Sequence, residues 1–330
     1  GAHAAGAGAM KIAISGAAGV RTPLIVDALI RRCERLGLSE LALMDIDAAR
    51  LAVIGQLLPP APFPVTPTTD AAAALRGADF VITTFRVGGI ASRALDETIP
   101  LKHGVLGQET TGPGGFAMAL RSIPVLLGYI DLMRGVCPDA WLINFANPAG
   151  LMAEAATRLG GWQRTVGICD APEGMLRVAA AVLGVSPSDL FLDYFGLNHL
   201  GWVRGVRAGG KDYLPQLIAM IAAAGGMPGL PFAPDLIRSL GMIPNEYLFY
   251  YYHSREAVEN LLAAGTTRAL QLVALNDELF RTLAALSERG DVDGMRAAHA
   301  AYLRRRGETY MARETGGQGH ELAAHPALAA

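Results

Sequence analysis

The stretch Lys11–Pro23, KIAISGAAGVRTP, decides the fold. Its first five residues form a short, mainly apolar run typical of a buried strand, and Gly16 then ends that run. Thr22 and Pro23 open a helix, because threonine caps helices well and proline suits the first helical position. A strand, a glycine turn and a helix in this order are typical of a dinucleotide-binding domain.

Further apolar runs follow in the first 200 residues, and helical stretches separate most of them. They are Leu41–Met44, Ala78–Thr84, Ala140–Phe145, Thr165–Cys169 and Leu190–Leu197. Short apolar strands separated by helices imply a parallel sheet covered on both faces. We therefore predict an α/β fold: a Rossmann-like, doubly wound parallel sheet of the lactate and malate dehydrogenase kind.

From about residue 200 the pattern becomes helical. The expected helices are Leu214–Ala224, Leu248–Ala264, Arg268–Arg289 and Asp291–Arg306. We predict an NAD-binding domain over residues 10–195 and a mostly helical domain over residues 196–330, which serves substrate and metal binding and oligomerisation. We expect residues 1–9 to be an extension before a start at Met10, and the tail after Gly316 to be a loop or a cut end.

Composition limits the classes of function. The 28 Lys and Arg residues nearly balance the 30 Asp and Glu residues, whereas a nucleic-acid-binding protein normally shows a basic excess. Glycine and proline interrupt the uncharged stretch at residues 213–234, so no membrane-spanning helix is expected there. The three cysteines are far apart and form no disulfide framework. We therefore expect a cytoplasmic protein with no nucleic-acid or membrane partner.

The turn Gly16–Gly19 is the expected nucleotide site. Its glycines let the backbone approach a pyrophosphate at the positive end of the next helix, which starts near Thr22. Asp45 ends the second strand, where an acid can hold the ribose hydroxyls and favours NAD over NADP. A strand–turn–helix unit without a ligand is the alternative.

Polar residues end three later strands. Asn147 follows the fourth strand, Cys169 and Asp170 the fifth, and Asn198 and His199 the sixth. A thiolate, an imidazole and nearby amides could bind a divalent metal and leave positions open for substrate. On spacing alone, a buried structural cysteine and a structural histidine are the commoner outcome.

Three further features could take part in a site. Arg86 lies on a glycine-bordered loop and could bind an anion, or form a surface ion pair. The polar, Gly-rich loop Gln108–Gly115 could surround a ligand or only turn the chain. Most of the four tyrosines between Tyr247 and Tyr252 should be core or interface aromatics, although a nearby metal could make one of them a base.

Together these segments resemble glycoside hydrolase family four, most closely its 6-phospho-β-glucosidase branch. The resemblance extends from Lys11 to about Gly316, and it separates the chain from malate and lactate dehydrogenases. It is carried by FRVGG at Phe85–Gly89, GQETTGPGG at Gly107–Gly115, NPAG at Asn147–Gly150, VGICDAP at Val166–Pro172, GLNH at Gly196–His199 and IPNEYLFYYYH at Ile243–His253.

The resemblance implies an unusual route to glycoside cleavage that needs NAD and a divalent metal, usually Mn²⁺. NAD⁺ takes hydride from carbon 3 of the sugar, and the ketone acidifies the proton on carbon 2. A tyrosine removes that proton while the metal stabilises the enediolate. The aglycone is then eliminated from carbon 1, water adds, and NADH returns the hydride.

The resemblance also implies residue roles. Cys169 and His199 match the metal ligands, Tyr247 the base, and Asn147 the residue that holds sugar hydroxyls. Asp170 is a candidate for protonating the leaving group. The remaining candidates are grouped by ligand: Gly16, Gly19, Thr22, Asp45 and Glu109 for the cofactor, and Arg86, Asn198 and Arg268 for the substrate, the two arginines for its phosphate.

The expected partners are a phosphorylated disaccharide or aryl glycoside and further copies of the chain, as a homodimer or homotetramer. The family usually continues beyond the Gly316 region, so we expect a second domain truncated at its C-terminus. The alternatives are a relative acting on a non-phosphorylated or uronic glycoside, a 2-hydroxy-acid dehydrogenase, and a nucleotide-binding scaffold without activity.

Overall fold

The computed structural model describes residues 9–227 and 229–317, and its contacts divide the chain into two compact units. Unit 1 comprises Gly1–Gly89, Met118–Ile168 and Asn276–Ala301. Unit 2 comprises Ile90–Ala117, Cys169–Leu275 and Tyr302–Ala330. Each unit is thus assembled from three separated segments, and the domain boundary between residues 195 and 196 stays a prediction.

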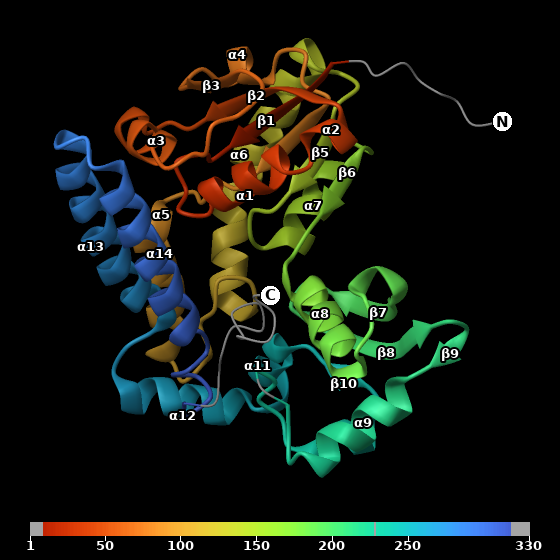
Figure 1. Ribbon diagram of the computed structural model, residues 1–330. Coiled ribbons are helices and arrows are strands. Elements are labelled where there is room, and N and C mark those ends of the chain that lie inside the picture. The colour runs from red at the N-terminus through yellow and green to blue at the C-terminus, as the bar shows by residue number, and fades with distance from the viewer. Residues whose placement is uncertain (1–8, 228, 318–330) are drawn as a thin grey trace. The chain divides into compact units, whose positions relative to one another are not determined.

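Unit 1 is built on a six-stranded parallel sheet with strand order β3-β2-β1-β4-β5-β6 (Figure 1). This is the doubly wound order of dinucleotide-binding domains, so the predicted fold class is confirmed. The strands are β1 (Met10–Ser15), β2 (Leu38–Met44), β3 (Val65–Thr68), β4 (Phe80–Thr83), β5 (Trp141–Asn144) and β6 (Thr165–Gly167).

Helices cover both faces of this sheet because its central strands are apolar on both sides. On β1, Ile12 and Ile14 pack with α1 (Thr22–Ile30) and α3 (Ala48–Gly55). Ala13, between them, faces the opposite core with α4 (Ala71–Leu75) and α6 (Gly112–Val136). The remaining helices here are α2 (Cys33–Leu36) and α7 (Ala149–Arg158).

Helix α6 is long and apolar enough, by length and composition, to cross a membrane, with a mean hydropathy of 1.5 over its most apolar 18 residues. Leu126, Ile130 and Met133 recur along one side of it and are fully buried in unit 1. Their spacing is that of the buried stripe of a core helix, whereas Leu120 and Leu132 on the same helix are exposed, and 33% of the apolar window is buried.

Unit 2 contains a small antiparallel sheet ordered β10-β8-β7, with β9 paired to β8. Its strands are β7 (Phe191–Leu197), β8 (Leu200–Ala208), β9 (Lys211–Asp212) and β10 (Ile243–Pro244). Its helices are α5 (Gly89–Leu101), α8 (Ala171–Leu183), α9 (Leu214–Ala223), α10 (Pro234–Leu240), α11 (Phe249–Tyr252) and α12 (Ser254–Ala264). Helices α13 (Arg268–Glu288) and α14 (Val292–Glu308) contribute residues to both units.

The prediction of the sixth parallel strand was wrong. The run Leu190–Leu197 contains β7 of the antiparallel sheet, and the parallel sheet has the edge strand β3 as its additional member. The sequence of β3, VTPT, lacks an apolar run because β3 is an edge strand, and such a position tolerates Pro67. Sequence patterns therefore gave no sign of it.

Smaller corrections concern helix ends. Arg21 is the N-cap of α1 and Thr22 its first residue, so threonine does not cap the helix, although Pro23 lies in the first turn as predicted. The helix expected at Leu248–Ala264 is interrupted at His253, which separates α11 from α12. Apart from Ala9, Gly316 and Gly317, the two predicted terminal segments lie outside the described residues.

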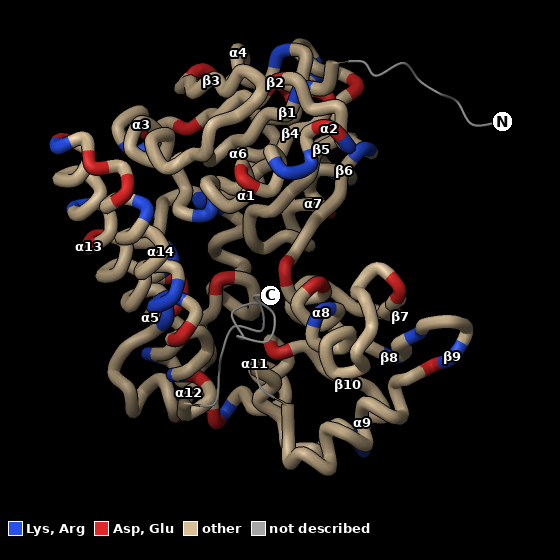
Figure 2. Tube along the Cα trace, viewed as in Figure 1, with Lys and Arg blue, Asp and Glu red and all other residues tan. Residues whose placement is uncertain are grey.

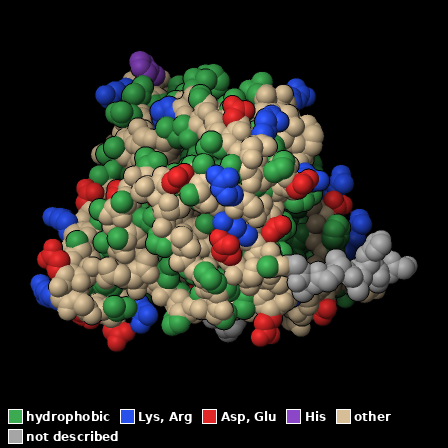
Figure 3. Space-filling model, turned by 90° about the horizontal axis from the view of Figure 1, so that it is seen from above, with side chains coloured by type: hydrophobic (Ala, Val, Ile, Leu, Met, Phe, Trp, Pro, Cys, Tyr) green, Lys and Arg blue, Asp and Glu red, His purple; other side chains and the backbone are tan. Residues whose placement is uncertain are grey.

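Acidic and basic residues are mixed along the chain. In Figure 2, Lys and Arg alternate with Asp and Glu in both units, in keeping with the net charge of −2. The face shown in Figure 3 likewise carries described side chains of both signs among apolar ones.

Candidate functional site

The first group of predicted residues lies at the carboxyl ends of β1 and β2 in unit 1. Gly16 has a φ of 91°, and a Cβ there would lie 2.4 Å from the backbone nitrogen of Phe85. Only glycine allows this close approach of the turn to the chain that follows β4. The turn then closes on itself, since Gly19 N–H donates to Gly16 O and Thr22 N–H donates to Gly19 O.

Asp45 holds this turn from the neighbouring strand. One carboxylate oxygen accepts the Ala18 N–H at 2.8 Å, and the other accepts the Asp47 N–H at 3.1 Å. A carboxylate has about four acceptor positions, so both oxygens retain capacity for sugar hydroxyls. An acid beside a glycine turn and the start of α1 is a donor and acceptor set that fits a dinucleotide.

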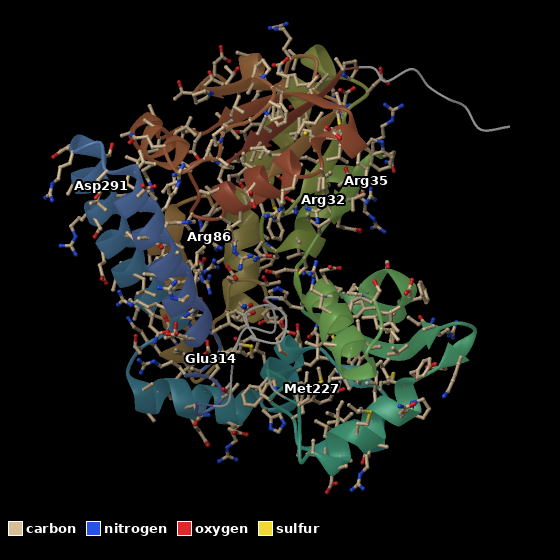
Figure 4. The ribbon with its side chains drawn as sticks, in the orientation of Figure 1. Arg32, Arg35, Arg86, Met227, Asp291 and Glu314 are labelled. Atoms are coloured by element: carbon tan, nitrogen blue, oxygen red, sulfur yellow. The ribbon has the colours of Figure 1, made fainter. Side chains whose placement is uncertain are left out.

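Two further predicted residues follow the next strands of unit 1. Arg86 (labelled in Figure 4) follows β4 in a loop, and Asn147 precedes a cis peptide bond to Pro148 at the start of α7. The segment that carries Asn147, between β5 and α7, is held by the buried Asn144, whose side-chain amide donates to Ala146 O at 2.9 Å. Thr83 in turn donates its hydroxyl hydrogen to the Asn144 carbonyl oxygen at 2.8 Å.

The second group lies in unit 2, around a two-residue hairpin turn. Asn198 and His199 connect β7 to β8, where Leu197 pairs with Leu200. His199 has a φ of 61°, which is uncommon for a residue other than glycine, and its side chain is 2% exposed. Its Nδ1 atom has no hydrogen-bond partner among the residues that the structure describes.

The electrostatic state of His199 suits metal binding. Burial lowers its pKa from 6.5 to about 4, against the opposing effects of Glu109 and Asp170, while Arg93 adds to the lowering. The imidazole is therefore neutral near pH 7, and a neutral imidazole is the form that binds a metal. An unpartnered ring nitrogen in a buried place is costly unless something binds it.

Tyr247 lies against His199. The two rings stack with centroids 3.5 Å apart and planes 9° from parallel. Tyr247 is in the one-turn 3₁₀ segment Glu246–Leu248, and the Tyr310 hydroxyl donates to its hydroxyl oxygen. Burial raises the pKa of Tyr247 well above 10, and the charges of Glu246, Asp170 and Cys169 raise it further.

Cys169 belongs to the same group. Its Sγ atom lies 3.7 Å from Oδ1 of Asp170, and it packs against the core cluster that includes Tyr247. Burial raises the pKa of the thiol to about 12, and Asp170 and Glu246 add to this effect. A thiol, a neutral imidazole and carboxylates together favour a divalent cation, which would replace the thiol proton and offset the acidic charge.

The described part of the chain contains no larger cluster of the usual metal-binding side chains. Within residues 9–227 and 229–317, no three His, Cys, Asp or Glu side chains form a group able to hold a metal ion. The assignment of Cys169 and His199 as metal ligands stays a prediction.

Glu109 and Arg268 lie at the edge of this group in unit 2. Glu109 forms an ion pair with Arg93 at 2.9 Å, and its charge acts on His199. Arg268 is 6% exposed and donates to the Thr309 hydroxyl and to the Arg306 carbonyl oxygen, each at 2.6 Å. Its guanidinium also lies over the ring of Tyr310, 5.8 Å from the centroid.

The predicted residues thus gather in two places. Unit 1 brings Gly16, Gly19, Thr22 and Asp45 together, and carries Arg86 and Asn147 at neighbouring strand ends. Unit 2 brings Cys169, Asp170, His199 and Tyr247 together. Four residues of this group were missed by sequence reasoning: Arg93, Glu97, Glu246 and Tyr310. The signal that could have pointed to the first two is the spacing of four residues between the opposite charges of Arg93 and Glu97 on α5.

Known proteins resemble this chain over most of its length. A family model described as "Family 4 glycosyl hydrolase" matches residues 11–185, and one described as "Family 4 glycosyl hydrolase C-terminal domain" matches residues 194–322. A 6-phospho-β-glucosidase from Escherichia coli is 38% identical over 263 residues, which are 75% of this chain and 58% of that protein. The chain thus covers less than two thirds of that relative.

Two further relatives agree. A 6-phospho-α-glucosidase from Lacticaseibacillus paracasei is 36% identical over 321 residues, which are 89% of this chain and 72% of that protein. The structure of a Thermotoga maritima 6-phospho-β-glucosidase with manganese, NAD⁺ and glucose 6-phosphate matches with a TM-score of 0.76 and 28% identity, covering 91% of this chain and 73% of the other. With a family model matching more than half of its residues, this chain belongs to glycosyl hydrolase family 4.

Proposed function

We propose that the protein hydrolyses 6-phospho-β-glucosides by oxidation at carbon 3 of the sugar, deprotonation at carbon 2, elimination of the aglycone, addition of water and re-reduction. Family membership and the relatives' phosphorylated substrates support this proposal. The observation that carries it is the group in unit 2, where a buried neutral imidazole stacks on a tyrosine within a thiol and carboxylate environment.

The proposed reaction needs two bound groups. When bound, NAD⁺ accepts and returns hydride at carbon 3, and a divalent cation, Mn²⁺ or another, stabilises negative charge on the oxygens of carbons 2 and 3. Gly16, Gly19, Thr22 and Asp45 would hold the dinucleotide, with Glu109 near the cofactor or the sugar. Cys169 and His199 would hold the cation.

Tyr247 is the proposed base for the proton on carbon 2. Burial and three acidic neighbours oppose the tyrosinate, so the hydroxyl keeps its proton at neutral pH unless positive charge is brought close. Cation binding at Cys169 and His199 would supply that charge beside the Tyr247 ring. The same change would favour the thiolate of Cys169 over its thiol.

Other side chains would position the substrate. Asn147 would hold sugar hydroxyls, Asn198 would contact the substrate at the hairpin turn, and Asp170 would protonate the leaving group. Arg86 in unit 1 and Arg268 in unit 2 are each proposed as a phosphate ligand, because guanidinium groups bind phosphate in a bidentate way.

The decisive experiment compares p-nitrophenyl β-glucoside with its 6-phosphate in the presence of NAD⁺, Mn²⁺ and a reductant. We expect turnover of the phosphorylated compound without net accumulation of NADH. Equal rates on both compounds would favour a relative acting on non-phosphorylated or uronic glycosides. Stoichiometric NADH with a 2-hydroxy acid would instead identify a dehydrogenase, and NAD⁺ binding without any turnover would identify a scaffold.

A 6-phospho-α-glucosidase is the second candidate. It is favoured by the relative from Lacticaseibacillus paracasei, which matches 89% of this chain. Elimination from an enediolate tolerates either anomer, because the bond to the aglycone breaks after the proton has left carbon 2. The α- and β-anomers of p-nitrophenyl glucoside 6-phosphate separate the two candidates.

We also propose a cytoplasmic homodimer or homotetramer. Cys33, Cys137 and Cys169 are free thiols, as a reducing compartment allows. Light scattering at several protein concentrations tests the oligomeric state. A monomer at every concentration would contradict it.

A further inference from the structure

The loop at residues 107–111 and the first turn of α6, which follows it, lie directly on the backbone of α5. A Cβ on Gly107, in the loop, would stand 2.2 Å from the carbonyl oxygen of Glu97, and one on Gly114, in α6, would stand 2.7 Å from that of Asp96. Contacts this short exclude any side chain, so these two glycines allow the loop and the start of α6 to dock on α5. The docked loop carries Glu109.

Arg93 joins this loop to α5. It is 5% exposed, and its Nε atom contacts Glu97 at 2.7 Å while Nη1 contacts Glu109 at 2.9 Å. One guanidinium therefore satisfies two carboxylates in a buried place. A planar, permanently charged group with several donors suits this bridging role.

Glu97 reaches a second element. Its other carboxylate oxygen accepts the N–H of Ala269 at 2.7 Å, in the first turn of α13, where N–H groups lack partners within the helix. The preceding residue is Arg268, whose guanidinium lies over Tyr310, and Tyr310 donates to Tyr247. A single buried carboxylate thus contacts both the side chain that holds Glu109 and the helix start that carries Arg268.

We propose that Glu97 is a positioning residue that sets Glu109 and Arg268 relative to each other within unit 2. Through Arg93 it fixes the Glu109 carboxylate, and through the Ala269 N–H it fixes the start of α13. Glu97 acts through its hydrogen bonds with Arg93 and with the Ala269 N–H. The inference rests on the proposed function, because it deepens the roles proposed for Glu109 and Arg268.

Two substitutions separate the two contacts. Glu97→Gln keeps an amide oxygen for the Ala269 N–H but removes the charge that faces Arg93. Glu97→Ala removes both. The matched control is Glu259→Gln on α12, where Arg255 and Glu259 form a pair of the same order and spacing, 2.9 Å apart and exposed to solvent.

With p-nitrophenyl β-glucoside 6-phosphate, NAD⁺ and Mn²⁺, we expect Glu97→Gln to lower kcat about 10- to 100-fold with KM changed less than about threefold. Glu97→Ala should also raise KM, because the start of α13 loosens. Glu259→Gln should stay within about twofold of the parent protein. The proposal is overturned if Glu97→Gln has the same kcat as Glu259→Gln. It is also overturned if the loss of kcat in Glu97→Gln equals the fraction of that protein that is unfolded.

Hydrogen exchange provides a readout that does not need activity. In Glu97→Ala, amides of residues 107–111 and 268–270 should exchange faster while those of α8 and α9 stay unchanged. In Glu97→Gln, only the loop should exchange faster. If the parent protein cleaves no phosphorylated glucoside, the proposed function fails. The exchange rates still decide whether Glu97 holds the loop and the start of α13. Unchanged exchange at residues 107–111 and 268–270 in Glu97→Ala overturns the inference.

Discussion

At the scale of single residues, the proposed site depends on groups whose charge states are shifted by burial. His199 is held neutral, while the Cys169 thiol and the Tyr247 hydroxyl are held protonated. Each of these shifts disfavours the charged form, as desolvation requires. The residues thus predict specific responses to metal, to pH and to substitution.

Metal binding should release a proton from Cys169. Its pKa of about 12 means that a cation must displace the proton near pH 7, so metal affinity should rise with pH, by up to about tenfold per unit. Calorimetry with Mn²⁺ in buffers of different ionisation enthalpy measures this release. Cys169→Ser should bind Mn²⁺ much more weakly than the parent protein, with the unfolding temperature unchanged. The control Cys33→Ser should bind Mn²⁺ as the parent protein does. Full Mn²⁺ affinity in Cys169→Ser would contradict the ligand assignment.

Stability should fall with acid because of His199. Its pKa is about 4 when folded and about 6.5 when unfolded, so the unfolded chain binds more protons between these values. Above about pH 6.5, His199 is neutral in both states and does not lower the free energy of unfolding. Between about pH 6.5 and pH 4, protonation of the unfolded chain lowers that free energy by about 3 kcal/mol. Urea unfolding at several pH values measures the change.

The variant His199→Asn should flatten that dependence, because asparagine tolerates a positive φ and does not titrate. His103→Asn, at an exposed position after α5, is the control, because it removes an imidazole and leaves His199 in place. An unchanged slope in His199→Asn would show that another group causes the loss.

Tyr247→Phe should slow proton removal from carbon 2 by about 10²- to 10⁴-fold, the usual contribution of a positioned base. The ring stacked on His199 is kept, so Mn²⁺ affinity should change little. The rate at which substrate labelled at carbon 2 loses its deuterium measures this step directly. Normal deuterium loss in the variant would exclude Tyr247 as the base.

At the scale of elements, close backbone contacts place the loop that carries Glu109. Gly107→Ala should destabilise the protein by about 1–3 kcal/mol, because its Cβ would meet the Glu97 carbonyl oxygen at 2.2 Å. Gly128→Ala, in α6 with nothing within 4 Å of the added atom, should instead stabilise by about 0.5–1 kcal/mol. Thermal unfolding compares the two, and equal effects would show that the loop shifts freely.

Elements also show where sequence reasoning succeeded and failed. The buried central strands β1, β2, β4 and β5 are apolar on both faces, so their patterns were plain. The edge strand β3 and the hairpin β7–β8 depend on pairing partners distant in sequence, and no local pattern records them. The motif singled out His199 as a candidate, but the burial of its side chain in a hairpin turn was not predicted. Arg93 and Glu97 were not singled out, because their spacing is common on exposed helix faces and burial of charge is a tertiary property.

At the scale of the whole molecule, cofactor binding should raise stability by mass action. NAD⁺ at about 100 times its dissociation constant should add about 2.7 kcal/mol to the free energy of unfolding. NADP⁺ at the same concentration should add less, since its extra phosphate would face the Asp45 carboxylate. The shift in unfolding temperature measures the stabilisation by each dinucleotide. Asp45→Asn should narrow the difference between the shifts with NAD⁺ and with NADP⁺, and Asp47→Asn is the control.

The three-segment assembly of unit 1 bears on how the polypeptide is made. His299 bonds to the carbonyl oxygen of Val20, Ser287 to Gln56, and Arg50 stacks on Phe280, so residues near the end of the chain pack on those near its beginning. While the chain leaves the ribosome, the early strands must wait for Asn276–Ala301 before their surface is complete. A nascent chain released before that point would lack the hydrogen bonds at Val20 and Gln56 and the ring that packs on Arg50, so its first-made part would be less stable than the complete unit.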